Sequence, residues 1–333
     1  MKHLTILNPH AGSYSPREHD RIARALSGLE GKVIATPDLS SLDLELQRHQ
    51  TYQPDVLGIG GGDGTVSHTL TQVQRLWGYI PSNLAVYAMG TMNNVAVPLG
   101  ACGGLYDTLK RYVGLDTKPV RVAQYIGRSS SSLHTESLAP MNINGRLGFN
   151  VGFGTTAKMV WMYYGKSMEQ FYAGSQQSEQ QKSGMMQVAG LLVEAFRALC
   201  NSSSAASQFF NQPLDAAIYI DGQKIEPATG IYLASYEQQN TGIFRAIPSP
   251  GARRHPGQME VVLSRGSIQD VILSLPSLMR GKPGRNMEYI QAKELRIESD
   301  KTIIAQVDGE FLCGREFEIR PDAPLKFISL SNH

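Results

Sequence analysis

A run of glycines around a single aspartate is the feature of this sequence best suited to chemistry. Residues 60–65 have the sequence Gly-Gly-Gly-Asp-Gly-Thr and directly follow the apolar segment 55–59. Glycine tolerates a positive φ and lets backbone N–H groups approach a ligand closely. Such N–H groups at the start of a helix form an anion site suited to phosphates. A tight turn needs fewer glycines, so we interpret residues 60–65 as a phosphate-binding loop.

The aspartate inside the glycine run, Asp63, distinguishes this loop from the common phosphate-binding motifs. A Walker P-loop would have a Lys-Ser/Thr pair after its last glycine, and the dinucleotide fingerprint spaces its glycines differently. This sequence has neither pattern. A carboxylate beside phosphates repels them unless a cation lies between, so the loop predicts Mg²⁺ between Asp63 and nucleotide phosphates, directly or through water.

A second group of carboxylates lies near the end of the chain, in the sequence Asp308-Gly309-Glu310. Asp-Gly is a common pair in a two-residue β-hairpin turn, so a purely structural turn is one interpretation. Two carboxylates close to a phosphate loop could instead orient or deprotonate a nucleophile. The residues alone leave both interpretations open.

The apolar pattern predicts two different halves. In residues 1–122, short apolar strands alternate with helical stretches, which is typical of a layered α/β sheet. In residues 123–333, strands dominate after a polar loop over 129–140, a Gln/Ser-rich stretch over 174–184 and an amphipathic helix over 185–200. We therefore expect an α/β fold with an N-terminal three-layer Rossmann-like domain and a larger C-terminal β-rich, β-sandwich-like domain. The last strand, 325–330, could pack back on the first domain.

The predicted elements of the first half place the glycine run between a strand and a helix. The strands are predicted at 4–7, 32–35, 55–59 and 84–88, and the helices at 16–29, 42–49, from Thr65 onward and at 105–113.

Composition excludes several classes of protein. The chain has 333 residues, 41% of them hydrophobic and 18% charged, with a formal net charge of +2. This charge gives no field that would favour nucleic acid as a partner. No apolar run approaches the ~18 residues that a spanning helix needs. Three scattered cysteines suit a reducing compartment, so we expect a cytoplasmic protein.

Several motifs in the same order resemble those of diacylglycerol kinase catalytic domains, a pattern shared with bacterial lipid kinases and sphingosine kinases. The segment 61–65 resembles the family's glycine signature, and 8–12 (Asn-Pro-His-Ala-Gly) its opening loop. The segment 90–94 (Gly-Thr-Met-Asn-Asn) resembles its Gly-Thr-x-Asn-Asp motif, and 307–310 its late Asp-Gly-Glu motif. The matches span almost the whole chain.

The resemblance implies an ATP-dependent kinase that phosphorylates a lipid such as diacylglycerol, a reaction of phospholipid biosynthesis. It implies ATP and Mg²⁺ as cofactors, peripheral contact with a membrane and, by analogy, a homodimer. Glu310 is the first choice for the base and Asp308 for its partner, while Asp63 is a rival base. The residues expected around the nucleotide are Asn8, Thr36, Gly60, Gly61, Gly62, Asp63, Gly64, Thr65, Val66, Ser67, Gly90, Thr91 and Asn93.

The sequence also departs from the family pattern. The Asn-Glu pair after the glycine loop is replaced by Ser67-His68, and the second Asp of the Gly-Thr motif by Asn94. In the loop where the family holds a structural cation, Pro256 stands where an aspartate is usual, so no protein metal ligands are assigned. These changes keep two alternatives open. One is a degenerate relative that binds nucleotide or lipid without turnover. The other is an NAD-kinase-like enzyme, which shares the Gly-Gly-Asp-Gly loop.

Overall fold

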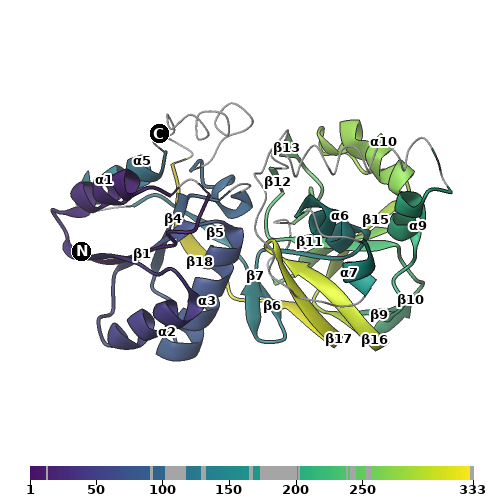
Figure 1. The fold of residues 1–333 in the computed structure, drawn as a ribbon, viewed down its shortest axis with the longest axis horizontal. Helices are drawn as coiled ribbons and strands as arrows, with labels where there is room; N and C mark the ends of the chain where they lie inside the picture. Colours follow the sequence, from purple (N-terminus) through teal and green to yellow (C-terminus); the bar gives the residue numbers. More distant parts are fainter. Residues whose placement is uncertain are drawn as a thin grey trace.

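The fold contains two sheets side by side along the long axis of the molecule (Figure 1). The computed structural model describes residues 1–12, 14–90, 93–101, 118–128, 133–164, 168–172, 201, 203–237, 239–240, 245–252, 255 and 257–330. The expected helices at 105–113 and 185–200 and the polar stretch at 174–184 lie outside these residues.

The first sheet has six strands in the order β2-β1-β3-β4-β18-β5, and β1 to β4 are parallel. Helices α1 and α5 pack together on one face, and α2 and α3 on the other, which gives the expected three layers (Figure 1). The elements up to residue 128 are β1 (Lys2–Leu7), α1 (Pro16–Leu26), β2 (Glu30–Ala35), α2 (Leu39–Arg48), β3 (Val56–Gly61), α3 (Asp63–Trp77), β4 (Asn83–Ala88), the 3₁₀ helix η1 (Asn94–Ala96) and α5 (Lys118–Arg128).

Local sequence explains where these helices begin and end. Ser15 and Asp38 cap α1 and α2, because each side chain accepts a backbone N–H from three residues along the chain. Gly78 ends α3 in the left-handed conformation that glycine favours. All six residues of β3 are buried, as expected for a central parallel strand covered on both faces.

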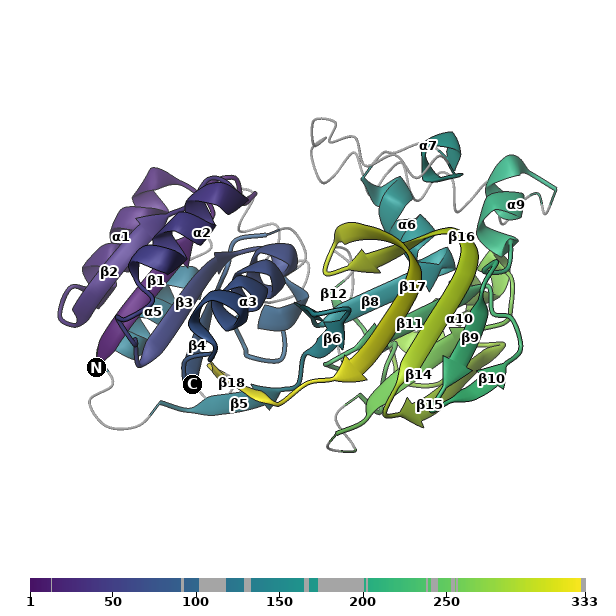
Figure 2. The same ribbon diagram turned by 90° about the horizontal axis from the view of Figure 1, so that it is seen from below.

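Two later segments complete the first sheet. β18 (Leu325–Ile328) pairs in parallel with β4, and β5 (Thr135–Leu138) pairs with β18 in antiparallel orientation (Figure 2). The polar pattern predicts a loop over 129–140, and for 135–138 this prediction is wrong. The segment is a polar edge strand in which only Leu138 is buried, so it lacks the apolar pattern of a strand. Helix α5 crosses residue 122, and the division of the chain at that point stays a prediction.

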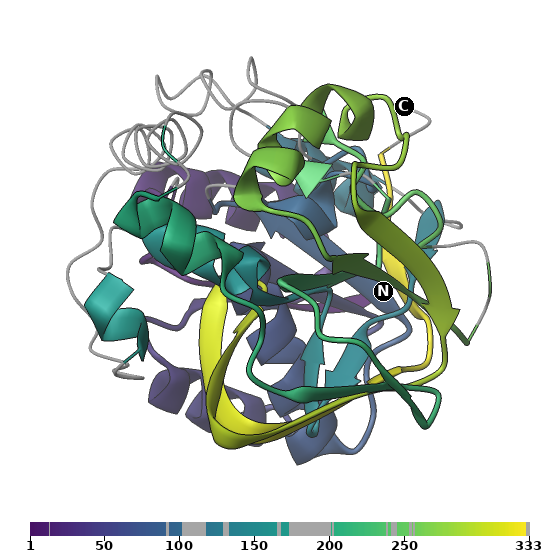
Figure 3. The same ribbon diagram turned by 90° about the vertical axis from the view of Figure 1, so that its right-hand side faces the viewer.

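The second sheet is antiparallel throughout and confirms the expected β-rich half. Its main path is β15-β14-β11-β8-β16-β17-β6-β7, with the β9–β10 hairpin attached to β16. The register between β16 and β17 shifts between Glu298 and Ile303, where the pair bends (Figure 3). The strands are β6 (Met141–Ile143), β7 (Arg146–Gly148), β8 (Asn150–Gly154), β9 (Ala217–Ile220), β10 (Gln223–Ile225), β11 (Gly230–Ala234), β14 (Met259–Ser264), β15 (Met287–Ala292), β16 (Leu295–Val307) and β17 (Glu310–Pro321).

Shorter elements surround this sheet: a two-stranded ribbon and four helices among the described residues. They are β12 (Gln239–Asn240), β13 (Arg245–Ala246), α6 (Thr155–Tyr163), α7 (Met168–Tyr172), α9 (Ala205–Asn211) and α10 (Ile268–Leu278). Within the described part of the chain, no helix has the length and apolar character needed to cross a membrane.

One hydrophobic core continues from the first sheet into the second. Phe149, Tyr232 and Tyr236 of the second half belong to the same buried cluster as Leu4 and Phe327 of the first sheet. Phe149 and Phe327 make an edge-to-face contact with ring centroids 5.8 Å apart. The two halves are therefore held together by shared apolar packing and by the return of the chain in β18.

Removing the Phe327 ring should test this packing. Its side chain is fully buried, so Phe327→Ala should lower the free energy of unfolding by about 3–5 kcal/mol. Lys326→Ala, at an exposed position of the same strand, is the control and should change it by less than about 0.5 kcal/mol. Urea unfolding measures the free energy of unfolding of both variants. Equal midpoints for the two would show that the Phe327 ring does not contribute to the packing between the halves.

Candidate active site

The expected nucleotide residues follow the carboxyl ends of neighbouring strands. Asn8 follows β1, Thr36 follows β2, and Gly90 lies two residues after β4. The N–H of Asn8 donates to the carbonyl of Gly60 at 2.8 Å, and its side-chain amide donates to Thr65 Oγ1 at 3.1 Å. The ends of parallel strands are where open α/β sheets bind their ligands.

The glycine loop is tighter than the sequence suggested. Gly60 and Gly61 extend β3, and α3 begins at Asp63 instead of at Thr65, so Gly62 alone separates strand from helix. Gly62 has no side chain to cap the helix, and the first N–H groups of a helix have no partner within it. These N–H groups and the positive end of the helix dipole suit an anion.

Asp63 connects this loop to the segment after β4. Its carboxylate accepts the N–H of Asn94 at 2.8 Å and the N–H of Val95 at 3.0 Å, and so caps η1. A Cβ at Gly90 would lie 2.4 Å from the Cα of Gly62, so the two backbones touch. Asn93, with a φ of 52°, accepts the N–H of Gly90 on its side-chain oxygen at 2.7 Å. Thr91 lies outside the described residues.

The Asp308-Gly309 pair forms the turn between β16 and β17. Both residues have a positive φ, of 51° and 88°, which two-residue hairpin turns require. With its amide oriented to satisfy the surrounding donors, Gln306 accepts the N–H groups of Asp308 and Gly309 at 3.1 and 2.7 Å. The motif therefore forms a hairpin turn, and this turn carries two carboxylates; their role in chemistry stays a prediction.

The structure brings this turn directly against the glycine loop. A Cβ at Gly64 would lie 2.9 Å from Glu310 Oε1 and 3.3 Å from the carbonyl oxygen of Asp308. Gly64 lies in the first turn of α3, and Glu310 begins β17 of the other sheet. A Cβ there would require the Glu310 carboxylate to move and the Asp308 carbonyl to shift by a few tenths of an ångström, so the two motifs lie in direct contact.

Asp308 is buried within this group. Its Oδ2 accepts the N–H of Phe149 at 2.9 Å, whereas its Oδ1 has no hydrogen-bond partner among the described residues. Burial raises the pKa of Asp308 well above its ordinary value, and the negative charge of Asp63 adds to the rise. The Phe149 N–H, Arg146 and the nearby Ser67 hydroxyl oppose the rise only in part. Ser67 Oγ makes no hydrogen bond of good geometry with a described residue.

Glu310 has a different environment. Its Oε2 forms an ion pair of 2.5 Å with Arg146 of β7, and its side chain is 46% exposed. Arg146 follows an Asn-Gly turn and carried no signal in the sequence, because nothing local relates it to a residue 164 positions away. The α3 residue His68 lies close to the pair: burial lowers the pKa of His68, and the charge of Glu310 opposes this.

Tyr164 is a further side chain at this site, within the aromatic-rich stretch 161–172. Its hydroxyl would lie 2.9 Å from a Cβ at Gly309, and its ring meets the ring of Phe311 edge to face. Burial, with the charges of Asp63 and Glu310, raises the pKa of Tyr164 to about 12. Tyr164 is therefore a neutral hydroxyl beside the turn at physiological pH.

The loop for which the resemblance implies a structural cation is held by a carboxylate of the chain. Glu260 is buried and accepts hydrogen bonds from Ser249 Oγ at 2.7 Å, from the N–H of Gly251 at 3.0 Å and from Gln291 Nε2 at 3.2 Å. These donors satisfy the carboxylate without a metal ion, so the described residues do not fit a structural cation there. Pro256 lies outside the described residues.

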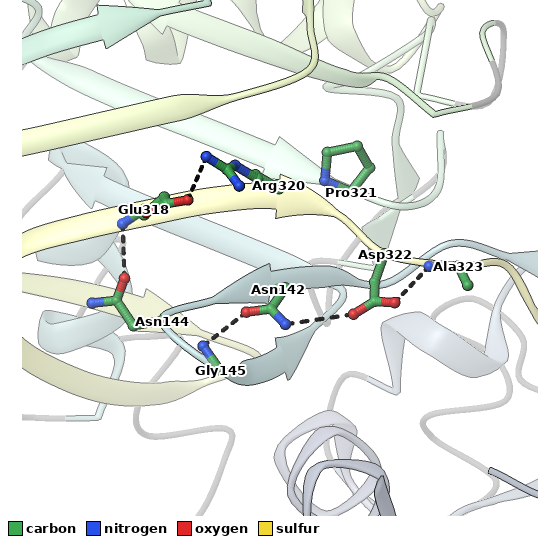
Figure 4. A pocket seen from close by; sticks show the side chains of 8 residues that line it. All are labelled: Asn142, Asn144, Gly145, Glu318, Arg320, Pro321, Asp322 and Ala323. Carbon is green, nitrogen blue, oxygen red and sulfur yellow. Dashed lines mark hydrogen bonds and ion pairs between the residues drawn. The ribbon is translucent and has the colours of Figure 1, made fainter. Parts of the chain in front are cut away.

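A surface pocket of about 460 Å³ lies elsewhere, between the β6–β7 turn and the end of β17 (Figure 4). Its polar groups bond one another: Asn142 accepts the N–H of Gly145 at 2.7 Å, and Asn144 accepts the N–H of Glu318 at 2.8 Å. None of the expected site residues lines this pocket.

The buried Asp308 should make stability depend on pH. Because its pKa is raised in the folded state, folded Asp308 holds a proton that the unfolded chain releases, and the free energy of unfolding falls as pH rises above the ordinary pKa of 3.8. Asp308→Asn cannot ionise, so its stability relative to the wild type should increase from about pH 4 to pH 8. Urea unfolding with a chelator present measures this difference.

The control is Asp300→Asn, which removes an exposed carboxylate from β16, the strand that precedes the turn. Equal pH dependence of the two variants would contradict the account of Asp308.

Comparison with known proteins supports the reading of the motifs. Residues 2–125 match the family model of the diacylglycerol kinase catalytic domain. A crystal structure of a proposed diacylglycerol kinase from Bacillus anthracis str. Sterne has a TM-score of 0.68 at 18% identity, with 99% of this chain and 96% of that chain covered. A crystal structure of a diacylglycerol kinase from the same organism has a TM-score of 0.61 at 15% identity, with 99% and 97% covered. A search among curated proteins gives no match. The resemblance is thus confirmed: residues 2–125 match the diacylglycerol kinase catalytic domain, and the chain shares the fold of these structures along nearly its whole length.

Proposed function

We propose that the protein is an ATP-dependent lipid kinase that transfers the γ-phosphate of ATP to a lipid hydroxyl. The observation that carries this proposal is the contact between Gly64 and the Asp308–Glu310 turn. Phosphoryl transfer needs a phosphate site and a carboxylate that orients the attacking hydroxyl, and catalysis is largely positioning and charge neutralisation. In this proposal, the contact would bring these two parts together across the two sheets.

The first half would hold the nucleotide. The N–H groups at the start of α3 would bind phosphate oxygens, and Asn8 and Thr36 would surround the nucleotide from the ends of neighbouring strands. The family motif implies that Thr91 would add a hydroxyl. Mg²⁺ would fit beside Asp63 and Asp308, because two carboxylates that disfavour each other's charge gain from a cation. When bound, Mg²⁺ would neutralise phosphate charge. Asp63 already accepts two N–H groups, which favours an anchoring role over the base role.

The contacts move the base assignment from Glu310 to Asp308. Asp308 Oδ1 lacks a partner among the described residues, and a cation beside Asp308 would favour its ionised form against the effect of burial, so that it could accept a proton. Glu310 is held by Arg146, which suits a positioning residue. In the proposed step the acceptor oxygen forms a bond to the γ-phosphorus, the bond from phosphorus to the bridging oxygen breaks, and ADP leaves. The hydroxyl proton passes to Asp308.

Aromatic packing beside the turn supports a lipid as acceptor over a dinucleotide. Trp161 and Phe311 have ring centroids 4.8 Å apart, and Trp161 and Phe171 have centroids 5.3 Å apart. Trp161 is fully buried, so Tyr164, Phe171 and Phe311, which are partly exposed, form the apolar flank near Gly309. An apolar flank suits acyl chains, and Tyr164 could hydrogen-bond the polar end of a lipid.

A transfer assay tests the proposal directly. Purified protein with γ-labelled ATP and Mg²⁺ should label one of several detergent-dispersed lipids: diacylglycerol, monoacylglycerol, phosphatidylglycerol, ceramide or a sphingoid base. Asp308→Asn should reduce the rate by a factor on the order of 10²–10⁴, as loss of a general base does, and Glu310→Gln by less.

Three results would count against the proposal. Label in NAD⁺ would identify the dinucleotide alternative. ATP binding without label in any lipid would identify a binding protein without turnover. Undiminished transfer by Asp308→Asn would remove the base assignment.

The contact at Gly64 generates a separate prediction. Gly64→Ala should reduce transfer by a factor on the order of ten, because its methyl group would displace the Glu310 carboxylate and shift the Asp308 carbonyl by a few tenths of an ångström. Gly28→Ala is the matched control, since a Cβ at Gly28 meets no atom within 4 Å. Initial-rate assays of both variants at saturating ATP measure the effect, and similar rates for the two would show that the contact does not matter.

A further inference from the structure

Helix α10 exposes an unusual amount of apolar surface. It buries Ile268, Ser274 and Leu278 on its inner side, and its capping box at Ser267 fixes its start. On the outer side, Leu273 is 59% exposed, and Met279, just after the helix, is 48% exposed. The exposed Pro276 lies between them at spacings of three residues, so the three share one face. Figures 1 and 3 show α10 at the outer surface of the second half.

Basic side chains follow this apolar stripe directly. Arg280, Lys282 and Arg285 are all exposed in the turn between α10 and β15. None of them forms an ion pair with a residue that the structure describes. The nearby Asp270 accepts hydrogen bonds from the backbone and the hydroxyl of Ser267, and the charge of Arg285 helps to lower the pKa of its carboxyl. The turn therefore presents positive charge next to exposed apolar atoms.

Helix α2 exposes similar apolar side chains but lacks an adjacent excess of positive charge, so it serves as a comparison. On α2, Leu39 is 57% exposed and Leu44 is 48% exposed, almost the same as the two residues at α10. The acidic neighbours on α2 are already paired with cations, Asp43 with Arg75 and Glu45 with Arg48. An anionic surface would therefore gain no charge attraction at α2, whereas it would attract the turn after α10.

We propose that α10 and the turn 279–285 form a docking surface for an anionic lipid bilayer. Leu273 and Met279 enter the boundary between headgroups and acyl chains, and the three cations contact lipid phosphates. A helix lying in the interface combines apolar burial and electrostatic attraction in this way. The inference goes beyond the proposed kinase activity and does not depend on turnover.

Vesicle sedimentation without ATP tests the docking surface. The protein should bind vesicles of phosphatidylcholine with phosphatidylglycerol more strongly than vesicles of phosphatidylcholine alone. Changing Arg280, Lys282 and Arg285 together to Gln should weaken partitioning on the order of a hundredfold, since each cation near an anionic surface contributes about fivefold. The double variant Leu273→Ser, Met279→Ser should weaken it about tenfold.

Two control variants test whether the location of the charged and apolar side chains matters, and not only their number. Lys32, Lys224 and Lys293 are exposed elsewhere, and changing all three to Gln removes the same charge. The double variant Leu39→Ser, Leu44→Ser removes the same apolar exposure. Both control variants should bind like the wild type. No binding to anionic vesicles, or equal losses in test and control variants, would overturn the proposal. Because ATP is absent, that failure would leave the proposed kinase activity untouched.

Discussion

The close approach of glycine backbones is the constraint on which the rest of the site depends. Gly62 touches Gly90 within the first half, and Gly64 touches the Asp308–Glu310 turn of the second half. A side chain at Gly90 would strike the backbone of Gly62, and one at Gly64 would displace the Glu310 carboxylate. Two sheets that share one apolar core can hold such a contact because their relative position is fixed by packing.

The three carboxyl groups where the two sheets meet differ in their hydrogen-bond partners. Asp63 accepts two backbone N–H groups, and Glu310 is paired with Arg146, so both keep stable partners. Asp308 is buried with one oxygen unpaired among the described residues, and its pKa is raised. An unpaired buried carboxylate is costly for folding. Such a cost is typical of functional sites, where a group is prepared for a reaction partner.

The sequence predicted what local patterns determine. The buried strand β3, the glycine loop and the Asp-Gly turn each follow from adjacent residues, and the order of motifs predicted the fold. The bond from Asn94 to Asp63 and the pair of Glu310 with Arg146 could not be predicted, because they join residues 31 and 164 positions apart. The polar edge strand β5 was missed because its pairing with β18, and not apolar alternation, makes it a strand.

The central claim is that the glycine loop and the Asp308–Glu310 turn act as one site, and a double-mutant cycle tests it most directly. Transfer rates are measured for the wild type, Gly64→Ala, Glu310→Ala and the double variant. Because the methyl group at position 64 would strike the Glu310 side chain, its effect should shrink once that side chain is removed. The account predicts a coupling of about 0.5–3 kcal/mol between the two changes. Effects that add within about 0.3–0.5 kcal/mol would contradict it.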